Sequence, residues 1–404
     1  MIARDREQEY RSSTPLELFF DLCFVVAVAQ AGTQLHHGLA DGHGWSELPA
    51  YAMVFFAVWW AWVNFTWFAS AYDTDDVLYR LLTLVQIAGV LVLAAGVPTG
   101  FETYNFTIMT YGYVIMRVAM IAQWIRVAIE YPPGRAAAVR YASGVAVCQI
   151  GWVIRLYLPH PWDLILFGVF AVCEGLVPIW AETRGRATSW HPEHIYDRYS
   201  CFTLIVLGEC VSALTLAVQA VVSSDHGVSV PLVVLAIAAL LLVFGLWWAY
   251  FKSDTTEALR ASLPTTMIWA YTHFLIFTSV AGLGATLSVA AETASGHNHV
   301  PVNDAALMVA LPVAVFLVAG NGLHSTLSRT FRIRERYIIG VAAALVGLSF
   351  TASTVGLAAT VALMAALVAA LLVVYLAGQH RAAMRALREG GRATDADQAT
   401  AATG

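Results

Sequence analysis

Five ionisable residues lie within long apolar stretches of the sequence: Asp21, Arg117, Glu174, Glu209 and His273. Ionisable side chains inside a bilayer are costly, and they are typically kept for proton transfer, ion binding or pairing with an opposite charge. Counted at 1.5 Å per helical residue, each lies about 9–15 Å from the same side of the apolar layer. The pattern therefore predicts a layer of ionisable groups contributed by five helices.

Glu209 is the strongest candidate for proton coupling in this layer. The layer holds three acids and one arginine, so if Arg117 neutralises one acid, the others are left with His273 or a proton. Arg117 is then the counter-charge of Glu209 or the contact for an anionic substrate, and Asp21 is the partner acid in the first half of the chain. Gly208 would let another helix approach closely beside Glu209. A purely structural role, as polar contacts that fix helix packing, stays open for all of these residues.

Further charged and aromatic residues lie near the ends of the apolar stretches. Thr14-Pro15-Leu16-Glu17 has the form of a capping box, so Glu17 either caps a helix that begins at Pro15 or takes part in function. Trp248 belongs to a tryptophan-rich pattern that is typical of packing or interfacial anchors. Three acids that end two of the stretches are either solvated or paired with nearby arginines: Asp73, Asp76 and Asp254.

No spacing in the sequence is typical of a metal or cofactor site. The histidines outside the apolar stretches lack cysteine or acidic partners at ligand spacing, and Pro192 interrupts the helical face of His191 and His194. The five cysteines lie within apolar stretches and are interpreted as small buried residues. Walker, Gly-x-Ser-x-Gly and His-Glu-x-x-His patterns are absent, so ATP-driven transport and the common hydrolase mechanisms lack support. We predict no metal, no cofactor and no nucleic-acid partner.

The composition requires lipid as the solvent for much of the chain. Of 404 residues, 59% are apolar and 12% are charged, and the net charge is −5. Soluble domains carry roughly 25% charged residues, so this chain could not cover its own surface in water. Twelve stretches are long enough to cross about 30 Å of hydrocarbon as helices. They lie near residues 15–35, 48–70, 77–97, 104–127, 138–158, 162–180, 199–221, 229–251, 264–288, 304–325, 337–354 and 357–378.

The distribution of basic residues predicts the orientation of these spans. Nineteen of the 22 lysines and arginines fall in the loops and tails on one side, and the loops on the other side hold none. Basic loops remain in the cytoplasm, so both termini are predicted to be cytoplasmic. The fold class is accordingly an all-α, polytopic membrane protein with about twelve transmembrane helices.

The chain divides into two six-helix halves and a tail. Residues 1–190 form the first half with its N-terminal tail, 191–378 the second half, and 379–404 a tail that is basic and then disordered. A shift of 180 residues places Glu17 and Asp21 over Asp197 and Cys201, and a shift of 181 places Asp73 over Asp254. Two parallel repeats are one interpretation of this similarity, but the other spans show no match.

Several of these motifs resemble the bacterial low temperature requirement protein A family. The motifs are Pro15-Leu-Glu-Leu-Phe-Phe-Asp21, Trp67-Phe-Ala-Ser-Ala-Tyr-Asp73-Thr-Asp-Asp76, Asp197-Arg198-Tyr199, Leu207-Gly208-Glu209 and Trp247-Trp248. The family pattern usually has Glu-Arg where this chain has Asp197-Arg198, and Gly-Glu-Ser where it has Gly208-Glu209-Cys210. The resemblance implies a polytopic protein of the bacterial inner membrane, and it supplies no substrate.

Three functions are compatible with these features. The first is a secondary transporter or permease for a small molecule or ion, coupled to protons through the carboxylates within the membrane. The second is an intramembrane enzyme acting on a lipid or isoprenoid, with Asp21, Glu174 or Glu209 as acid or base. The third is a non-catalytic protein whose buried charges specify helix packing. The absence of a recognisable nucleophile favours the first over the second, and no catalytic residue is assigned.

Overall fold

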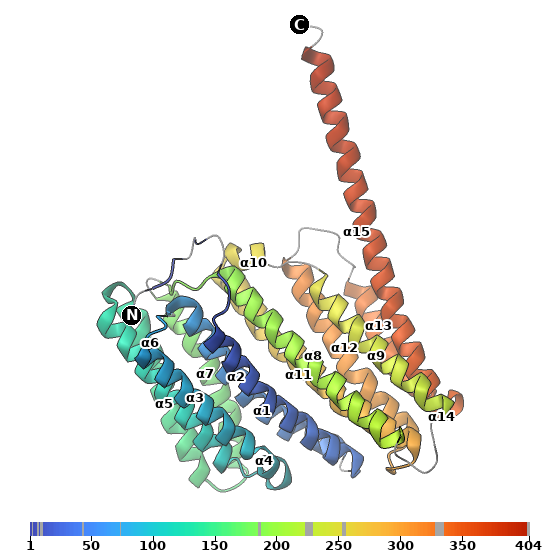
Figure 1. Cartoon of the computed structure of the whole chain (residues 1–404), viewed down its shortest axis with the longest axis horizontal. Coiled ribbons are helices and arrows are strands. Elements are labelled where there is room, and N and C mark those ends of the chain that lie inside the picture. Colours follow the sequence, from blue (N-terminus) through green and yellow to red (C-terminus); the bar gives the residue numbers. More distant parts are fainter. Residues whose placement is uncertain are drawn as a thin grey trace. The chain divides into compact units, whose positions relative to one another are not determined.

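The computed structural model describes most of the chain. The residues outside its description are 2, 6–7, 9–10, 43, 73, 185–186, 223–228, 253–255, 328–334 and 402–404. In the described part every regular element is a helix (Figure 1). This confirms the all-α fold class.

Fifteen α-helices and three short 3₁₀ turns make up the described elements. The first seven helices are α1 Pro15–Ala40, α2 Glu47–Tyr72, α3 Val77–Ala95, α4 Val97–Thr103, α5 Thr107–Glu130, α6 Arg135–Ile154 and α7 Trp162–Thr183. The others are α8 Pro192–Val222, α9 Val230–Phe251, α10 Thr256–Ala261, α11 Leu263–Ser295, α12 Val302–Leu327, α13 Glu335–Ser349, α14 Ala352–Val355 and α15 Leu357–Ala401. The 3₁₀ turns are η1 Gly44–Ser46, η2 Pro132–Gly134 and η3 Arg155–Tyr157.

Among the described residues, eleven helical segments are long and apolar enough to cross a membrane. They correspond to eleven of the twelve predicted spans. The remaining prediction, residues 337–354, falls on α13, whose 15 residues rise about 22 Å. That is shorter than about 30 Å of hydrocarbon, although α13 packs alongside α12 and α15.

The local sequence explains where several helices begin and how closely they pack. The Thr14 hydroxyl accepts a hydrogen bond from the Glu17 N–H, and the Glu17 carboxylate accepts one from the Thr14 N–H, which confirms the capping box at α1. Asp76 caps α3 in a similar way. Gly89 lets α3 approach α5, because a Cβ atom there would lie 2.8 Å from the carbonyl oxygen of Gly112. Small residues commonly permit such close helix contacts in membranes.

The helices form two compact units. The first contains Met1–Ala220 and Phe277–Val300, and the second contains Val221–Ile276 and Pro301–Gly404. This grouping differs from the two halves predicted at residues 1–190 and 191–378, because α8 and the end of α11 pack with the first unit. Internal duplication of the sequence stays a prediction.

The C-terminal tail, which was expected to end in a disordered segment, is part of helix α15. Its backbone is helical as far as Ala401. The segment after residue 379 continues the last span and is rich in alanine and arginine, which have high helix propensities. The helix can therefore extend beyond the apolar stretch without a break.

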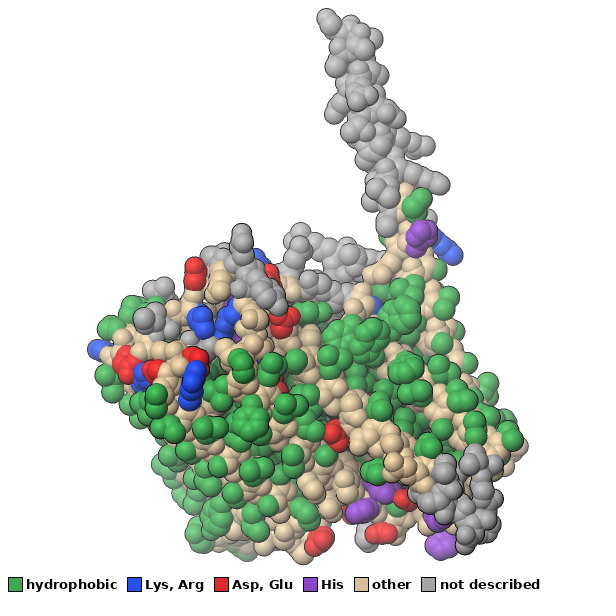
Figure 2. All heavy atoms as spheres, viewed as in Figure 1, with side chains coloured by type: hydrophobic (Ala, Val, Ile, Leu, Met, Phe, Trp, Pro, Cys, Tyr) green, Lys and Arg blue, Asp and Glu red, His purple; other side chains and the backbone are tan. Residues whose placement is uncertain are grey.

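The surface of the first unit divides into apolar and charged parts. Figure 2 shows hydrophobic side chains along the exposed sides of its helices, whereas acidic and basic side chains gather near the N-terminal end of the chain. Exposed apolar residues such as Leu22, Val118, Val147 and Leu176 lie in the middle of these helices. This distribution is expected for a surface that faces lipid tails.

Candidate functional site

A buried charge cluster joins α1 to α8 inside the first unit. Glu17 and Asp21 are four residues apart on α1, and His194 and Arg198 are four residues apart on α8. Side chains at this spacing lie on one face of a helix, one turn apart. The side chains of all four residues are at most 2% exposed. We call these residues, together with Arg11, the α1–α8 charge cluster.

Arg198 is the central cation of the α1–α8 charge cluster. Its Nε donates to Asp21 Oδ2 at 2.9 Å, its Nη2 donates to Asp21 Oδ1 at 2.5 Å, and its Nη1 lies 3.4 Å from Glu17 Oε1. Two parallel contacts of this kind are the strongest pairing an arginine makes with a carboxylate. Asp21 therefore has a structural arginine partner, and the partner is the Arg198 of the Asp197-Arg198 motif.

Side chains from the N-terminal segment, α2 and α8 complete the contacts of both acids. The Trp62 indole N–H on α2 donates to Asp21 Oδ1 at 2.6 Å. His194 Nε2 lies 3.1 Å from Glu17 Oε1. Arg11 Nη2 lies 3.4 Å from the same Glu17 oxygen and also donates to the Ala69 carbonyl at 2.9 Å. The N-terminal segment, α1, α2 and α8 are thus held together by one buried network.

A second buried ion pair lies between α5 and α7. Arg117 Nη2 is 3.2 Å from Glu174 Oε2, and both side chains are 2% exposed. The Tyr113 hydroxyl donates to Glu174 and accepts from Arg117, so it bridges the pair. The sequence left open which acid pairs with Arg117, and in the structure that acid is Glu174 rather than Glu209.

Glu209 differs from the other two acids of the spans. It lies near the middle of α8 and is half-buried, and it forms no hydrogen bond or ion pair within the part of the chain that the structure describes. Gly208 does not bring a second helix close, because a Cβ atom there would have no neighbour within 4 Å. Close packing with α11 occurs two residues later, where the Cys210 thiol donates to the Val280 carbonyl at 3.0 Å.

His273 lies in the second unit and is a hydrogen-bonded packing residue. Its Nδ1 is 2.7 Å from the Trp269 carbonyl oxygen, and its Nε2 is 2.9 Å from the Tyr250 hydroxyl. These contacts are compatible with the structural role that the sequence left open for His273, and its functional role stays a prediction. Trp248, also in the second unit, is 48% exposed, as expected for a residue that anchors a span at an interface.

The charged residues at the ends of the first-unit helices are paired. Asp76 accepts a hydrogen bond from Arg126 Nη1 at 2.8 Å, and this bond holds the pKa of its carboxyl at about 2. Arg80 pairs with Asp75 at 2.7 Å, which also lowers the pKa of Asp75. Asp197 is half-buried beside Arg198. Asp73 and Asp254, which the sequence also singled out, lie outside the described residues.

Several members of these networks were not predicted from the sequence as site residues. His194 was noticed only as half of an interrupted metal-like pair, Arg11 only as a basic residue of the N-terminal tail and Trp62 only as part of a tryptophan-rich pattern, and Tyr113 was not singled out. The available signal was spacing: two acids four residues apart on α1 match a histidine and an arginine four residues apart on α8. Nothing local in the sequence marks Tyr113 as the bridge between Arg117 and Glu174.

The fold and these networks define a multi-span helical membrane protein with fully buried ion pairs. The chain also matches a known family over most of its length. Residues 12–375 match the model of the bacterial low temperature requirement A protein (LtrA) family, and the chain belongs to that family. An uncharacterized protein of Rhizobium meliloti (strain 1021) is 26% identical over 301 residues, which cover 69% of this chain and 70% of the relative.

Proposed function

We propose that this protein is a proton-coupled secondary transporter in which Glu209 carries the coupled proton. The observation behind the proposal is the unequal pairing of the three acids within the spans. Asp21 and Glu174 each have an arginine within 3.2 Å, whereas Glu209 has no partner in the part of the chain that the structure describes. An ionised carboxylate in hydrocarbon is costly without a counter-ion, so Glu209 is the group best suited to bind and release a proton.

The position of Glu209 on α8 connects proton binding to the rest of the first unit. The same helix carries His194 and Arg198, which hold α1 through Glu17 and Asp21. A change in charge at Glu209 would alter the environment that α8 prefers, and the buried contacts would transmit a shift of α8 to α1. Coupled transporters require such a link between protonation and helix position.

The membrane and orientation belong to the same proposal. We place the protein in the bacterial cytoplasmic membrane with both termini in the cytoplasm, because the loops and tails on one side hold nineteen of the 22 basic residues. The charged end of the first unit would then face the anionic inner leaflet. Arg135 is exposed there, where it could contact lipid headgroups.

The proposal is tested by proton flux in liposomes. Purified protein is reconstituted with a pH-sensitive dye inside, and a panel of small metabolites and ions is added outside. We expect one class of solute to cause a pH change that wild type supports and Glu209→Gln abolishes. Glu102→Gln is the matched control, because it makes the same substitution at an exposed acid of α4.

Two outcomes would contradict this function. One is a solute-dependent proton flux of equal size in wild type and Glu209→Gln. The other is the absence of flux across the whole panel, with both proteins folded. In that case an altered lipid profile in a deletion strain would favour the enzymatic alternative.

A further inference from the structure

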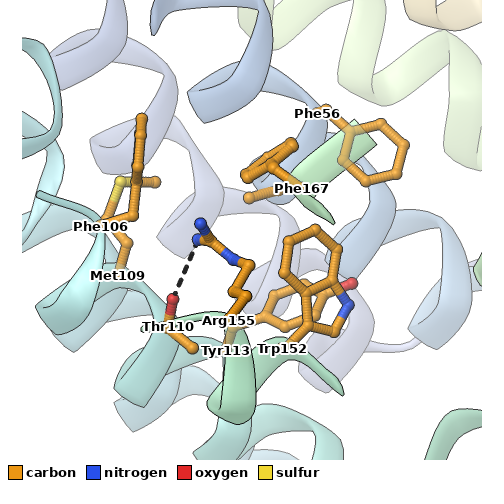
Figure 3. A pocket seen from close by; sticks show the side chains of 9 residues that line it. Phe56, Phe106, Met109, Thr110, Tyr113, Trp152, Arg155 and Phe167 are labelled. Carbon is orange, nitrogen blue, oxygen red and sulfur yellow. Dashed lines mark hydrogen bonds between the residues drawn. The ribbon is translucent and has the colours of Figure 1, made fainter. Parts of the chain in front are cut away.

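A small pocket in the first unit contains a buried cation. Its free volume is about 20 Å³, and it is partly open to the outside. Figure 3 shows the guanidinium of Arg155 extending among aromatic rings, close to the hydroxyl of Thr110. The lining comes from α2, α5, η3 and the helices beside it: Phe56, Ala57, Phe106, Met109, Thr110, Tyr113, Trp152, Arg155 and Phe167.

The contacts of Arg155 leave its charge incompletely satisfied. The residue is 2% exposed. Its Nη2 lies 3.4 Å from Thr110 Oγ1, its Nη1 lies 3.4 Å from the Asp163 carbonyl oxygen, and its Nε–H has no partner. Buried arginine donors are normally paired, because leaving one unsatisfied costs the desolvation of a charged group.

No carboxylate of the described residues lies within ion-pair distance of this guanidinium. The nearest acid in sequence is Asp163, but it faces Arg155 through its backbone carbonyl, and its carboxylate lies 3.4 Å from His160 Nδ1. The rings of Phe167, Trp152 and Phe106 lie 5.0, 5.2 and 5.7 Å from the Arg155 Cζ. Ring faces attract a cation, but they offer no acceptor for its N–H groups.

We propose that this pocket binds a small organic monocarboxylate. The carboxylate would accept hydrogen bonds from Arg155 Nε and Nη, the fork geometry that arginine offers to carboxylates. Thr110 would contribute its hydroxyl. The enclosed space is small and charged, whereas the surrounding wall is almost entirely apolar and aromatic. A compact anionic head with a short apolar tail matches this division.

The pocket also reaches the buried ion pair of α5 and α7. Tyr113 lines the pocket, and its hydroxyl contacts both Arg117 and Glu174. Only the Tyr113 side chain would therefore separate a bound anion from the Arg117–Glu174 pair. The inferred site is separate from Glu209, and its occupancy does not depend on whether the protein transports protons.

Binding is tested by calorimetry on the full-length protein in detergent and chloride-free buffer. The probes are acetate, hexanoate and benzoate, with benzamide as a neutral analogue of benzoate. We expect a carboxylate probe to bind wild type at one site and benzamide not to bind. Arg155→Gln should weaken binding roughly 10- to 100-fold, the usual effect of removing a charged hydrogen-bond partner.

Two further variants separate binding from folding. Ala57→Phe fills the pocket and leaves the guanidinium in place, so it should abolish binding even if Arg155→Gln does not fold. Arg184→Gln removes an exposed charge elsewhere and should bind as wild type does. The proposal is overturned if none of the three carboxylates binds wild type at millimolar concentration. It is also overturned if Ala57→Phe binds unchanged, or if chloride competes as well as benzoate does.

Discussion

Individual charged residues in the spans fall into two groups. Asp21 and Glu174 are buried acids whose charge is balanced by Arg198 and Arg117 at hydrogen-bond distance. Glu209 and Arg155 are an acid and a base for which the described residues provide no opposite charge. Paired groups fix the packing of helices, while an unpaired group is stabilised by something that comes from outside, such as a proton or a bound anion.

Two substitutions of Asp76, the N-cap of α3, distinguish what its hydrogen-bond acceptor contributes to stability from what its negative charge contributes. Asp76→Ala removes both the cap of the Tyr79 N–H and the contact with Arg126, and it should cost about 1 kcal/mol through the cap alone. Asp76→Asn retains a capping oxygen and should cost less. Thermal unfolding in detergent measures both, and equal losses for the two variants would contradict this assignment.

Asp76 is also expected to make the stability of the protein depend on pH. The pKa of Asp76 is about 2 in the folded protein, below its ordinary value of 3.8. Its stabilising contribution is therefore complete above pH 4 or so and decreases as the pH falls toward 2. The difference in unfolding temperature between wild type and Asp76→Asn should narrow over that interval. A difference that stays constant would show that the carboxylate charge contributes nothing.

Lys252, the single lysine of the chain, is expected to react as a neutral amine at an unusually low pH. Burial lowers its pKa to about 8, and its Nζ lies 4.2 Å from the centre of the Tyr375 ring. Acylation by an amine-reactive ester, followed by mass spectrometry, should increase through pH 8. A lysine introduced by Arg184→Lys, which is exposed, should react only near its ordinary pKa of about 10.4. Identical pH profiles would contradict the assignment.

Among the helices, α1 and α8 depend on each other through opposite charges at matching intervals. Glu17 and Asp21 on one helix face His194 and Arg198 on the other, so a register shift of either helix would break several contacts together. Removing one member of a buried pair typically costs 3–5 kcal/mol, because the other charge stays buried. The matching four-residue spacing of the charges on the two helices therefore favours one register of α1 against α8.

A double-mutant cycle measures this coupling. Asp21→Leu and Arg198→Met should each destabilise the protein by about 3–5 kcal/mol, and the double variant that combines them should lose much less than their sum. Asp75→Asn is the control, since its exposed pair with Arg80 should contribute less than about 1 kcal/mol. Additive losses at Asp21 and Arg198 would mean that the pair is not coupled.

The sequence predicted the helices better than their contacts. Hydropathy locates a span because it sums over about 20 residues, and the cap at Thr14 is local. Which side chains meet across helices depends on the rotation and register of both, and no short segment encodes these. For this reason the sequence left open which acid pairs with Arg117, and close packing was expected at Gly208 but occurs beside Cys210.

At the scale of the whole molecule, α13 determines on which side the chain ends. With twelve spans both ends lie on the same side, and with eleven they lie on opposite sides. We predict twelve, because α13 packs alongside the spans α12 and α15 although it has only 15 residues. The buried face of α13 includes Ile338, Ala342 and Leu345.

Cysteine labelling in intact cells tests this topology. In a background with the five native cysteines replaced by alanine, Glu102→Cys should react with a membrane-impermeant maleimide. Arg184→Cys and Met384→Cys, both exposed, should react only after the membrane is permeabilised. Labelling of Met384→Cys in intact cells, with Arg184→Cys still protected, would indicate eleven spans.

We propose Glu209 as the acid of the spans that carries a proton, whereas Asp21 and Glu174 are each paired with an arginine. A lipid-soluble carbodiimide adds to protonated carboxyl groups in apolar surroundings, and peptide mass spectrometry identifies the modified residue. We predict modification at Glu209 and none at Asp21 or Glu174 in the folded protein in membranes. Modification of Asp21 or Glu174 while Glu209 stays unmodified would contradict the account.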